Sequence, residues 1–322
     1  MPPFVATILC IAFILWLFWL DKDKSVRPSM ALWIPTAWFF FACSRSFGKW
    51  LSLAPTYAAG DAADVMGEGS PADKVVYAFL LVLALIVLLN RSERVKRFLR
   101  YSWPVVLCFG YAFLSIAWSS FPDIAFKRWT KGVGDLIMVL VVWTDPRPID
   151  GFKRLIARLA FVLIPLSELL DKYYPKLGRI YDRGFGNTMY IGVTSDKNGL
   201  GAICLLLGLA TFWRLLQAFE DRDDPRRKKR LIAHCLILVL TLWLLKQSNS
   251  MTATSCLLVA MSAMCAARWR LVIRSQWLIH CVVFWAILIP ASVALLGASP
   301  ELLKALGRNP TLTDRTFIWA EV

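Results

Sequence analysis

Basic side chains border a glycine-rich segment near the middle of the chain, YDRGFGNTMYIGVTSDKNGLG (181 to 201). Asp196, or the serine before it, can cap a helix that starts near Asn198, which would leave backbone N–H groups directed outward at the positive end of that helix. A helix N-terminus that carries Lys197 beside a glycine-rich loop is a physical description of a phosphate site. We therefore predict an anion site here, with Arg183 as a second cation. The alternative, a solvated loop whose basic residues pair with nearby aspartates, stays open.

A second arginine lies near the end of the chain, in NPTLTDRTFIW (309 to 319). Arg315 stands between two threonine hydroxyls, and the guanidinium fork suits bidentate contact with phosphate oxygens. Phe317 and Trp319 can pack at the level of lipid headgroups. These residues favour either a second anion contact or a loop held by interfacial aromatics. The glycine spacing of the first segment fits no P-loop or dinucleotide fingerprint, so nucleotide binding is not supported.

Further polar residues occupy two short segments. The connection KQSNSMTATS (246 to 255) is so short that Ser248 and Ser250 must lie at membrane depth or just above it. Their hydroxyls can serve helix packing and capping, or they can line a polar pocket. Arg128 and Lys131 add positive charge to a second outward connection. Since Lys131 precedes Asp135 by one helical turn, we expect these two residues to form an ion pair.

The remaining ionisable and sulfur-containing residues predict no metal and no cofactor. The eight cysteines all lie within apolar segments and show neither metal-ligand spacing nor a disulfide framework. His234 and His280 fall in the first turns of apolar segments, where we expect them to pack. Glu168 lies near the end of such a segment, and acids within membrane spans are functional candidates by default. It can also simply mark the end of its helix.

The elements that must position these residues follow from the composition, which is 58% apolar and 18% charged. This balance is typical of an integral membrane protein. A hydrocarbon core of ~30 Å requires roughly 20 apolar residues per helix, and ten candidate spans are present. They are residues 4 to 20, 31 to 46, 75 to 90, 103 to 119, 132 to 144, 155 to 170, 198 to 216, 231 to 246, 252 to 267 and 276 to 297. Because backbone groups in lipid must bond within their own segment, the predicted fold is an all-α polytopic transmembrane helical bundle.

The orientation follows from the basic residues in the connections. They concentrate in alternate connections, 21 to 29, 91 to 100, 145 to 154, 220 to 230 and 268 to 274, which should therefore be cytoplasmic. The outer loops are then 47 to 74, 120 to 131, 171 to 197 and 298 to 322 of a single membrane domain covering residues 1 to 322. Most of the formal net charge of +15 reflects this topology and contact with anionic lipid, not nucleic acid.

Several of these segments, taken in order, resemble one family. YIGVTSDKNGLG, QSNSMTATS and LTDRTFIW are similar to motifs of the bacterial O-antigen ligase and Wzy-type polysaccharide polymerase superfamily. LWIPTAWFFFACSRS (32 to 46), EGSPAD (68 to 73) and FKRWTK (126 to 131) resemble its exopolysaccharide-polymerase-like branch. The resemblance implies a GT-C-like fold in the bacterial inner (cytoplasmic) membrane, with the active face periplasmic.

The resemblance also implies an activity, namely a metal-independent glycosyltransferase whose donor is an undecaprenyl-pyrophosphate-linked oligosaccharide. Arg183 and Arg315 take the catalytic, pyrophosphate-binding role, and Lys197 assists them. The implied partners are this donor, a saccharide acceptor, membrane lipids and a chain-length regulator. Compared with the family, Asp196 replaces a frequent histidine and Asp314 a frequent glycine. The family continues past the Arg-Thr motif, so we expect this chain to be truncated at its C-terminus and to lack the base that activates the acceptor.

Three other functions stay open. The N-terminal segments favour polymerisation of O-antigen or exopolysaccharide repeat units, and the alternative is an O-antigen or protein O-oligosaccharide ligase. A transporter of lipid-linked saccharide should show repeat symmetry or charged residues near the middle of several spans, and such residues are scarce here. A membrane scaffold without catalytic activity would need neither arginine.

Overall fold

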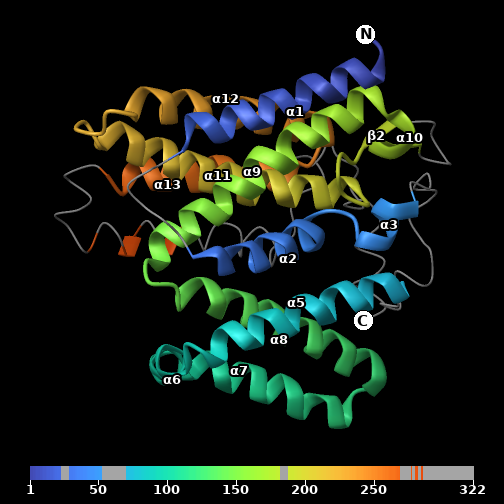
Figure 1. Ribbon diagram of the computed structural model, residues 1–322, viewed down its shortest axis with the longest axis vertical. Helices are drawn as coiled ribbons and strands as arrows, with labels where there is room; N and C mark the ends of the chain where they lie inside the picture. The colour runs from blue at the N-terminus through green and yellow to red at the C-terminus, as the bar shows by residue number, and fades with distance from the viewer. Residues whose placement is uncertain are drawn as a thin grey trace. The chain divides into compact units, whose positions relative to one another are not determined.

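The computed structural model in Figure 1 describes residues 1–22, 29–52, 70–181 and 188–268, together with positions 277, 280, 281, 284 and 285. Over these residues the backbone is almost entirely helical, and the one strand pair among them is short. The predicted all-α class is therefore confirmed for the described residues. The chain divides into two compact units, Met1–Met261 and Ser262–Val322. The packing described below belongs to the first of them.

The helices follow one another along the chain with short connections. The first are α1 (Pro3–Leu20), the 3-10 helix η1 (Met30–Leu32), α2 (Trp33–Cys43), α3 (Phe47–Ser52), α5 (Pro71–Leu89), α6 (Ser92–Tyr101), α7 (Trp103–Leu114) and the 3-10 helix η2 (Ser115–Trp118). They are followed by α8 (Pro122–Trp143), α9 (Pro148–Tyr173), α10 (Pro175–Gly178), β1 (Arg179–Tyr181), β2 (Thr188–Tyr190), α11 (Lys197–Glu220), α12 (Arg227–Ser248) and α13 (Met251–Ala266).

Four of the described helices, α1, α5, α11 and α12, are long and apolar enough to cross a membrane. A fifth crossing is counted if α6 and the segment α7–η2, bent by 84° at their junction, form one broken span. The segment η1–α2 and helix α13 are apolar but shorter. The predicted span 276 to 297 lies mostly outside the described residues. The count of ten spans and the GT-C-like arrangement therefore stay predictions.

The long helices expose large apolar side chains. Examples are Phe4, Leu15 and Trp19 of α1, Val82 and Ile86 of α5, and Val239 and Trp243 of α12. Soluble monomers rarely expose extended apolar patches, so these surfaces fit contact with lipid. The lengths of these helices and the apolar side chains on their exposed faces thus both fit a membrane environment.

Local signals set several helix ends. Helix α5 begins with a capping box in which Ser70 Oγ accepts from the Asp73 N–H at 3.2 Å and Asp73 Oδ2 accepts from the Ser70 N–H at 3.1 Å. Helix α12 ends at Asn249, whose left-handed φ of 50° lets the chain turn directly into α13. These ends depend on residues close in sequence, which is why they can be recognised from the sequence.

Two groups of helices form the core of the first unit. Helices α11 and α12 pack as an antiparallel pair against α1 and α9 (Figure 1), and their centre is the buried set Phe161, Leu163, Leu200, Ile237 and Leu244. Helices α2, α5 and α8 surround a second set, Trp38, Ala84, Met138 and Val141. Since α2 and α8 also contact α9, that helix joins the two groups.

The connections gather at two ends of this unit. At one end, here called the inner end, Arg214 pairs with Asp21 at 3.2 Å and Arg91 lies 3.7 Å from Asp145. At the other, the outer end, the Gly48 N–H donates to Asp73 Oδ1 at 2.7 Å and the Arg45 N–H donates to the Val193 carbonyl before α11. The connections at the inner end are among those that the basic residues predict to be cytoplasmic, and the connections at the outer end are among those predicted to face outward. The compartment that each end faces stays a prediction.

Candidate functional site

The turn that precedes α11, residues 191–196, is the outer turn. It follows a β-hairpin in which Arg179 pairs with Tyr190 and Tyr181 with Thr188, a feature that the sequence analysis did not foresee. Asp196 caps α11, as expected, because its Oδ1 accepts from the backbone N–H groups of Asn198 and Gly199 at 2.9 Å each. Those two groups are therefore not free for an anion, and the anion site at this helix start stays a prediction. A phosphate would have to compete with the Asp196 carboxylate for them.

Glycine is required at position 192 of the outer turn. Gly192 has a φ of +54°, and a Cβ built on it would lie 2.8 Å from the Cβ of Ser167 in α9. Its N–H donates to Asp171 Oδ1 at 2.9 Å, also in α9. The Val193 N–H lies 3.4 Å from Ser167 Oγ. The polar end of α9 thus holds the outer turn by its backbone, which explains the polar residues in this part of an otherwise apolar chain.

Arg45, which the sequence analysis did not single out, holds the outer turn from the other side. Its side chain is buried, with only 2% of the residue exposed. The guanidinium donates to the carbonyl oxygens of Leu177, of Gly192 at 3.1 Å and of Thr194 at 3.3 Å. The Arg45 N–H also donates to the Val193 carbonyl at 3.0 Å. Because its donors are taken up by carbonyls, Arg45 positions the turn and does not offer a free charge to a ligand.

Two carboxyl oxygens at this end lack hydrogen-bond partners among the described residues. They are Oδ2 of Asp171 and Oε2 of Glu168, both buried and one helical turn apart on α9. Buried oxygens without a donor are uncommon in native structures and mark places where a further polar group can bind. Glu168 also lines an apolar groove of about 350 Å³ between α1, α9 and α12, together with Phe13, Tyr173 and Leu240.

The serine connection meets the start of α11. A Cβ built on Gly201 would lie 2.8 Å from both Cβ and Oγ of Ser250, so the two backbones approach closely here. The Ser250 carbonyl accepts from Thr254 in the first turn of α13. Ser248 is buried, and its Oγ donates to the Leu245 carbonyl at 2.9 Å. Both serines therefore take part in the packing of the hairpin, which is one of the two roles considered for them, and the pocket-lining role stays a prediction.

The exposed basic candidates lie on two different helices. Lys197 is half-buried and Asn198 exposed at the start of α11, whereas Arg128 and Lys131 are exposed on α8. Lys131 does not pair with Asp135, so that expectation is wrong. Instead, Asp135 Oδ1 accepts from the Trp38 indole at 2.7 Å, since a half-buried N–H needs an acceptor more than an exposed ammonium does.

The two arginines expected to bind pyrophosphate lie outside the described residues, Arg183 within 182–187 and Arg315 within 286–322. Among the residues that are described, no three His, Cys, Asp or Glu side chains are grouped as metal ligands would be. His234 is buried at the inner end, where its ring lies 5.6 Å from that of Phe161. The packing role expected for it is confirmed.

No family model, curated protein or solved structure matches this chain. The function is therefore argued from the residues and their arrangement alone.

Proposed function

We propose that this chain is a membrane-embedded glycosyltransferase that takes an undecaprenyl-pyrophosphate-linked oligosaccharide as donor and polymerises saccharide repeat units at its outer end. One observation carries the proposal. Two segments that are far apart in sequence, YIGVTSDKNGLG and QSNSMTATS, lie against each other there through Gly201 and Ser250. Both segments are rich in polar residues, and a shared binding site would require that proximity.

The proposed reaction is a displacement at the anomeric carbon of the donor sugar. An acceptor hydroxyl forms the new glycosidic bond, the bond from that carbon to the pyrophosphate oxygen breaks, and undecaprenyl pyrophosphate leaves with the bonding electrons. Arg183 and Arg315 hold the pyrophosphate and stabilise its developing negative charge. Lys197 and Asn198 extend this binding surface, and Arg128 and Lys131 add positive charge on α8. The base that takes the hydroxyl proton is not assigned to any residue.

The architecture of the outer end supports this assignment in two ways. The outer turn is held by Arg45, Ser167 and Asp171, so a ligand that binds beside Lys197 meets a backbone fixed in advance. The apolar groove beside Glu168 lies between the α1 and α9 helices and offers a surface for the polyprenyl chain. A lipid-linked donor needs both a polar and an apolar contact within reach of each other.

The test is substitution of each arginine in the full protein, expressed in cells that lack the endogenous activity. Arg183→Ala and Arg315→Ala should each reduce the amount of polymer by roughly ten- to a hundredfold, since a hydrogen bond to a charged oxygen contributes about 1.5–3 kcal/mol. Arg100→Ala is the matched control, because Arg100 is exposed on α6 near the inner end and should leave product length unchanged. Normal polymer from both outer variants at equal expression would disprove the proposed function. Chains transferred whole to lipid A core or protein would identify a ligase instead.

A further inference from the structure

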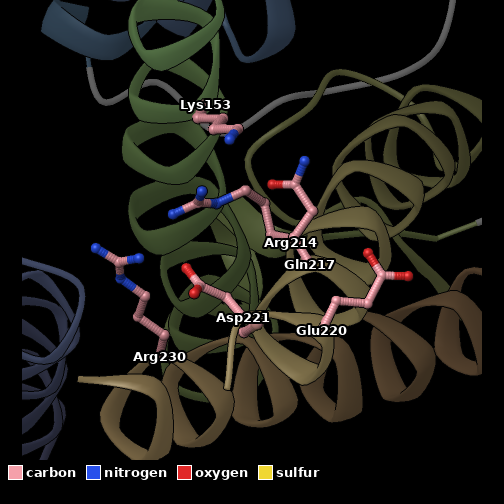
Figure 2. A pocket seen from close by; sticks show the side chains of 7 residues that line it. Lys153, Arg214, Gln217, Glu220, Asp221 and Arg230 are labelled. Atoms are coloured by element: carbon pink, nitrogen blue, oxygen red, sulfur yellow. The ribbon is translucent and has the colours of Figure 1, made fainter. Parts of the chain in front are cut away.

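A second polar site, shown in Figure 2, lies at the inner end. It is a pocket of about 380 Å³ between the start of α9, the end of α11 and the start of α12. Its lining includes six polar or charged side chains, Lys153, Arg214, Gln217, Glu220, Asp221 and Arg230. No part of the glycosyltransferase proposal uses these residues.

The pocket carries charges of both signs. In Figure 2 the amino group of Lys153 and the guanidinium of Arg214 lie in the upper part, and the carboxylate of Asp221 lies below them at the end of α11. Arg230, a third cation of the lining, lies beside Asp221 in the figure, and its Nη1 pairs with Asp224 at 2.7 Å. An anion alone would be attracted by Lys153 and Arg214 and repelled by Asp221, whereas a ligand that carries both a negative and a positive group would satisfy both signs.

Arg214 is held in place by neighbours outside the pocket. Its Nη2 pairs with Asp21 Oδ1 at 3.2 Å, and His234 Nε2 lies 3.4 Å from the same oxygen. Burial tends to raise the pKa of Asp21, but the nearby His234 ring and the positive charges of Arg214 and Arg230 together hold that pKa below its usual value. Asp21 therefore stays ionised and orients the guanidinium.

Some buried polar atoms of the lining have no hydrogen-bond partner among the described residues. Examples are Nε of Arg214, which is a donor, and the side-chain oxygen of Gln217. Since such atoms cost free energy when left unsatisfied, a polar ligand that reaches them recovers that cost. The pocket thus offers a ligand one N–H donor, from Arg214, that no described residue uses.

The surroundings of the pocket indicate a lipid rather than a soluble ligand. The ring of Phe152 packs on Trp213 at 6.4 Å, and Lys153 Nζ lies 5.8 Å from the centre of the same indole. Phe152 and Phe219 are 40% and 52% exposed. Aromatic and basic side chains at the ends of apolar helices are typical of the membrane interface, where lipid headgroups lie. The mouth of the pocket is therefore next to a surface suited to acyl chains.

We infer that this pocket binds the headgroup of a zwitterionic phospholipid that carries a phosphodiester and a primary ammonium. The phosphate oxygens accept from Lys153 and Arg214, and the ammonium donates to Asp221. Because a quaternary ammonium has no N–H to donate, a phosphocholine lipid makes only the first set of contacts. Preference for phosphatidylethanolamine over phosphatidylcholine is then the signature of the site.

The experiment measures binding of phosphatidylethanolamine with a fluorescent label on its acyl chain to the purified full chain in detergent. Unlabelled phosphatidylethanolamine should displace the probe at a concentration about tenfold or more below that needed for phosphatidylcholine or phosphatidylglycerol. Soluble phosphoethanolamine should compete far more weakly, because it lacks the acyl chains. Equal displacement by the three lipids would overturn the inference, and strong displacement by soluble phosphoethanolamine would overturn the assignment to a lipid.

Two variants and a control test the residues. Lys153→Gln and Asp221→Asn should each weaken binding of the probe about tenfold or more, and Asp221→Asn should also reduce the preference over phosphatidylcholine. Lys96→Gln removes an exposed lysine of α6 that pairs with Glu93 at 2.9 Å, and it should change neither quantity. Circular dichroism of each variant checks that its helices are retained. Unchanged affinity in both folded pocket variants, or an equal loss in the control, would refute the proposed contacts.

Discussion

Substitution of Gly192 by alanine tests whether the outer turn is held as described. The native φ of +54° is left-handed, which costs an alanine about 1–2 kcal/mol. The new Cβ would also lie 2.8 Å from the Ser167 Cβ, and overpacking of this kind typically costs about 1–3 kcal/mol. Taken together, we expect Gly192→Ala to lower the free energy of unfolding by about 2–5 kcal/mol.

The chain offers a matched control for this prediction. Gly110 lies inside α7, and a Cβ built on it would meet nothing within 4 Å. Since alanine is the better helix former, Gly110→Ala should be neutral or stabilise by up to about 1 kcal/mol. The measurement is denaturant-induced unfolding of both variants in the same detergent, followed by tryptophan fluorescence. If Gly192→Ala proves as stable as Gly110→Ala, then position 192 is not held in a left-handed conformation against Ser167, and the account of the outer turn is wrong.

Two further predictions concern buried charges at the two ends. Arg45→Met removes the Arg45 donors from two carbonyls of the outer turn and from the Leu177 carbonyl of α10, so it should destabilise the protein by about 3–5 kcal/mol. Arg45→Lys should recover only part of this. Full stability of Arg45→Met in thermal unfolding would contradict the positioning role. The pKa of Asp21 is held low by His234, Arg214 and Arg230. The Asp21 carboxylate therefore contributes to the stability of the fold at pH values above about 4, and this contribution is lost as the pH falls through the lower pKa of the folded state. Asp21→Asn should therefore be less stable than the parent at neutral pH, and the difference should shrink on acidification; a difference independent of pH would refute this linkage.

At the outer end, the residues proposed to bind the donor differ from the residues that hold the outer turn in place. Arg45 and Asp171 are engaged with backbone groups of the turn, whereas Lys197, half-buried, and Asn198, exposed, follow the turn at the start of α11. A loss of activity in Arg45→Met would thus be accompanied by lost stability. A loss of activity at Arg183 or Arg315 should leave stability unchanged, and this difference distinguishes the two kinds of role.

Several features could be read from the sequence because neighbouring residues decide them. The helices α1, α5, α11 and α12 begin and end within a few residues of the predicted spans, since a long apolar run favours a helix whatever it packs against. The cap at Asp196 was likewise foreseen, because the cap and the N–H groups that it accepts from are adjacent in sequence. The polar composition of the outer turn was also evident, although its cause was not.

Only the tertiary structure decided which partner each polar side chain has. Arg45 is distant in sequence from the carbonyls of Gly192 and Thr194, and Asp135 accepts from Trp38 although Lys131 lies one turn away. A buried donor or acceptor binds whichever partner the packing of the helices brings within reach, and that packing depends on every helix at once. The sequence by itself determined where apolar helices and polar turns occur. The fold decided which of the polar residues hold a turn in place and which remain exposed at its surface.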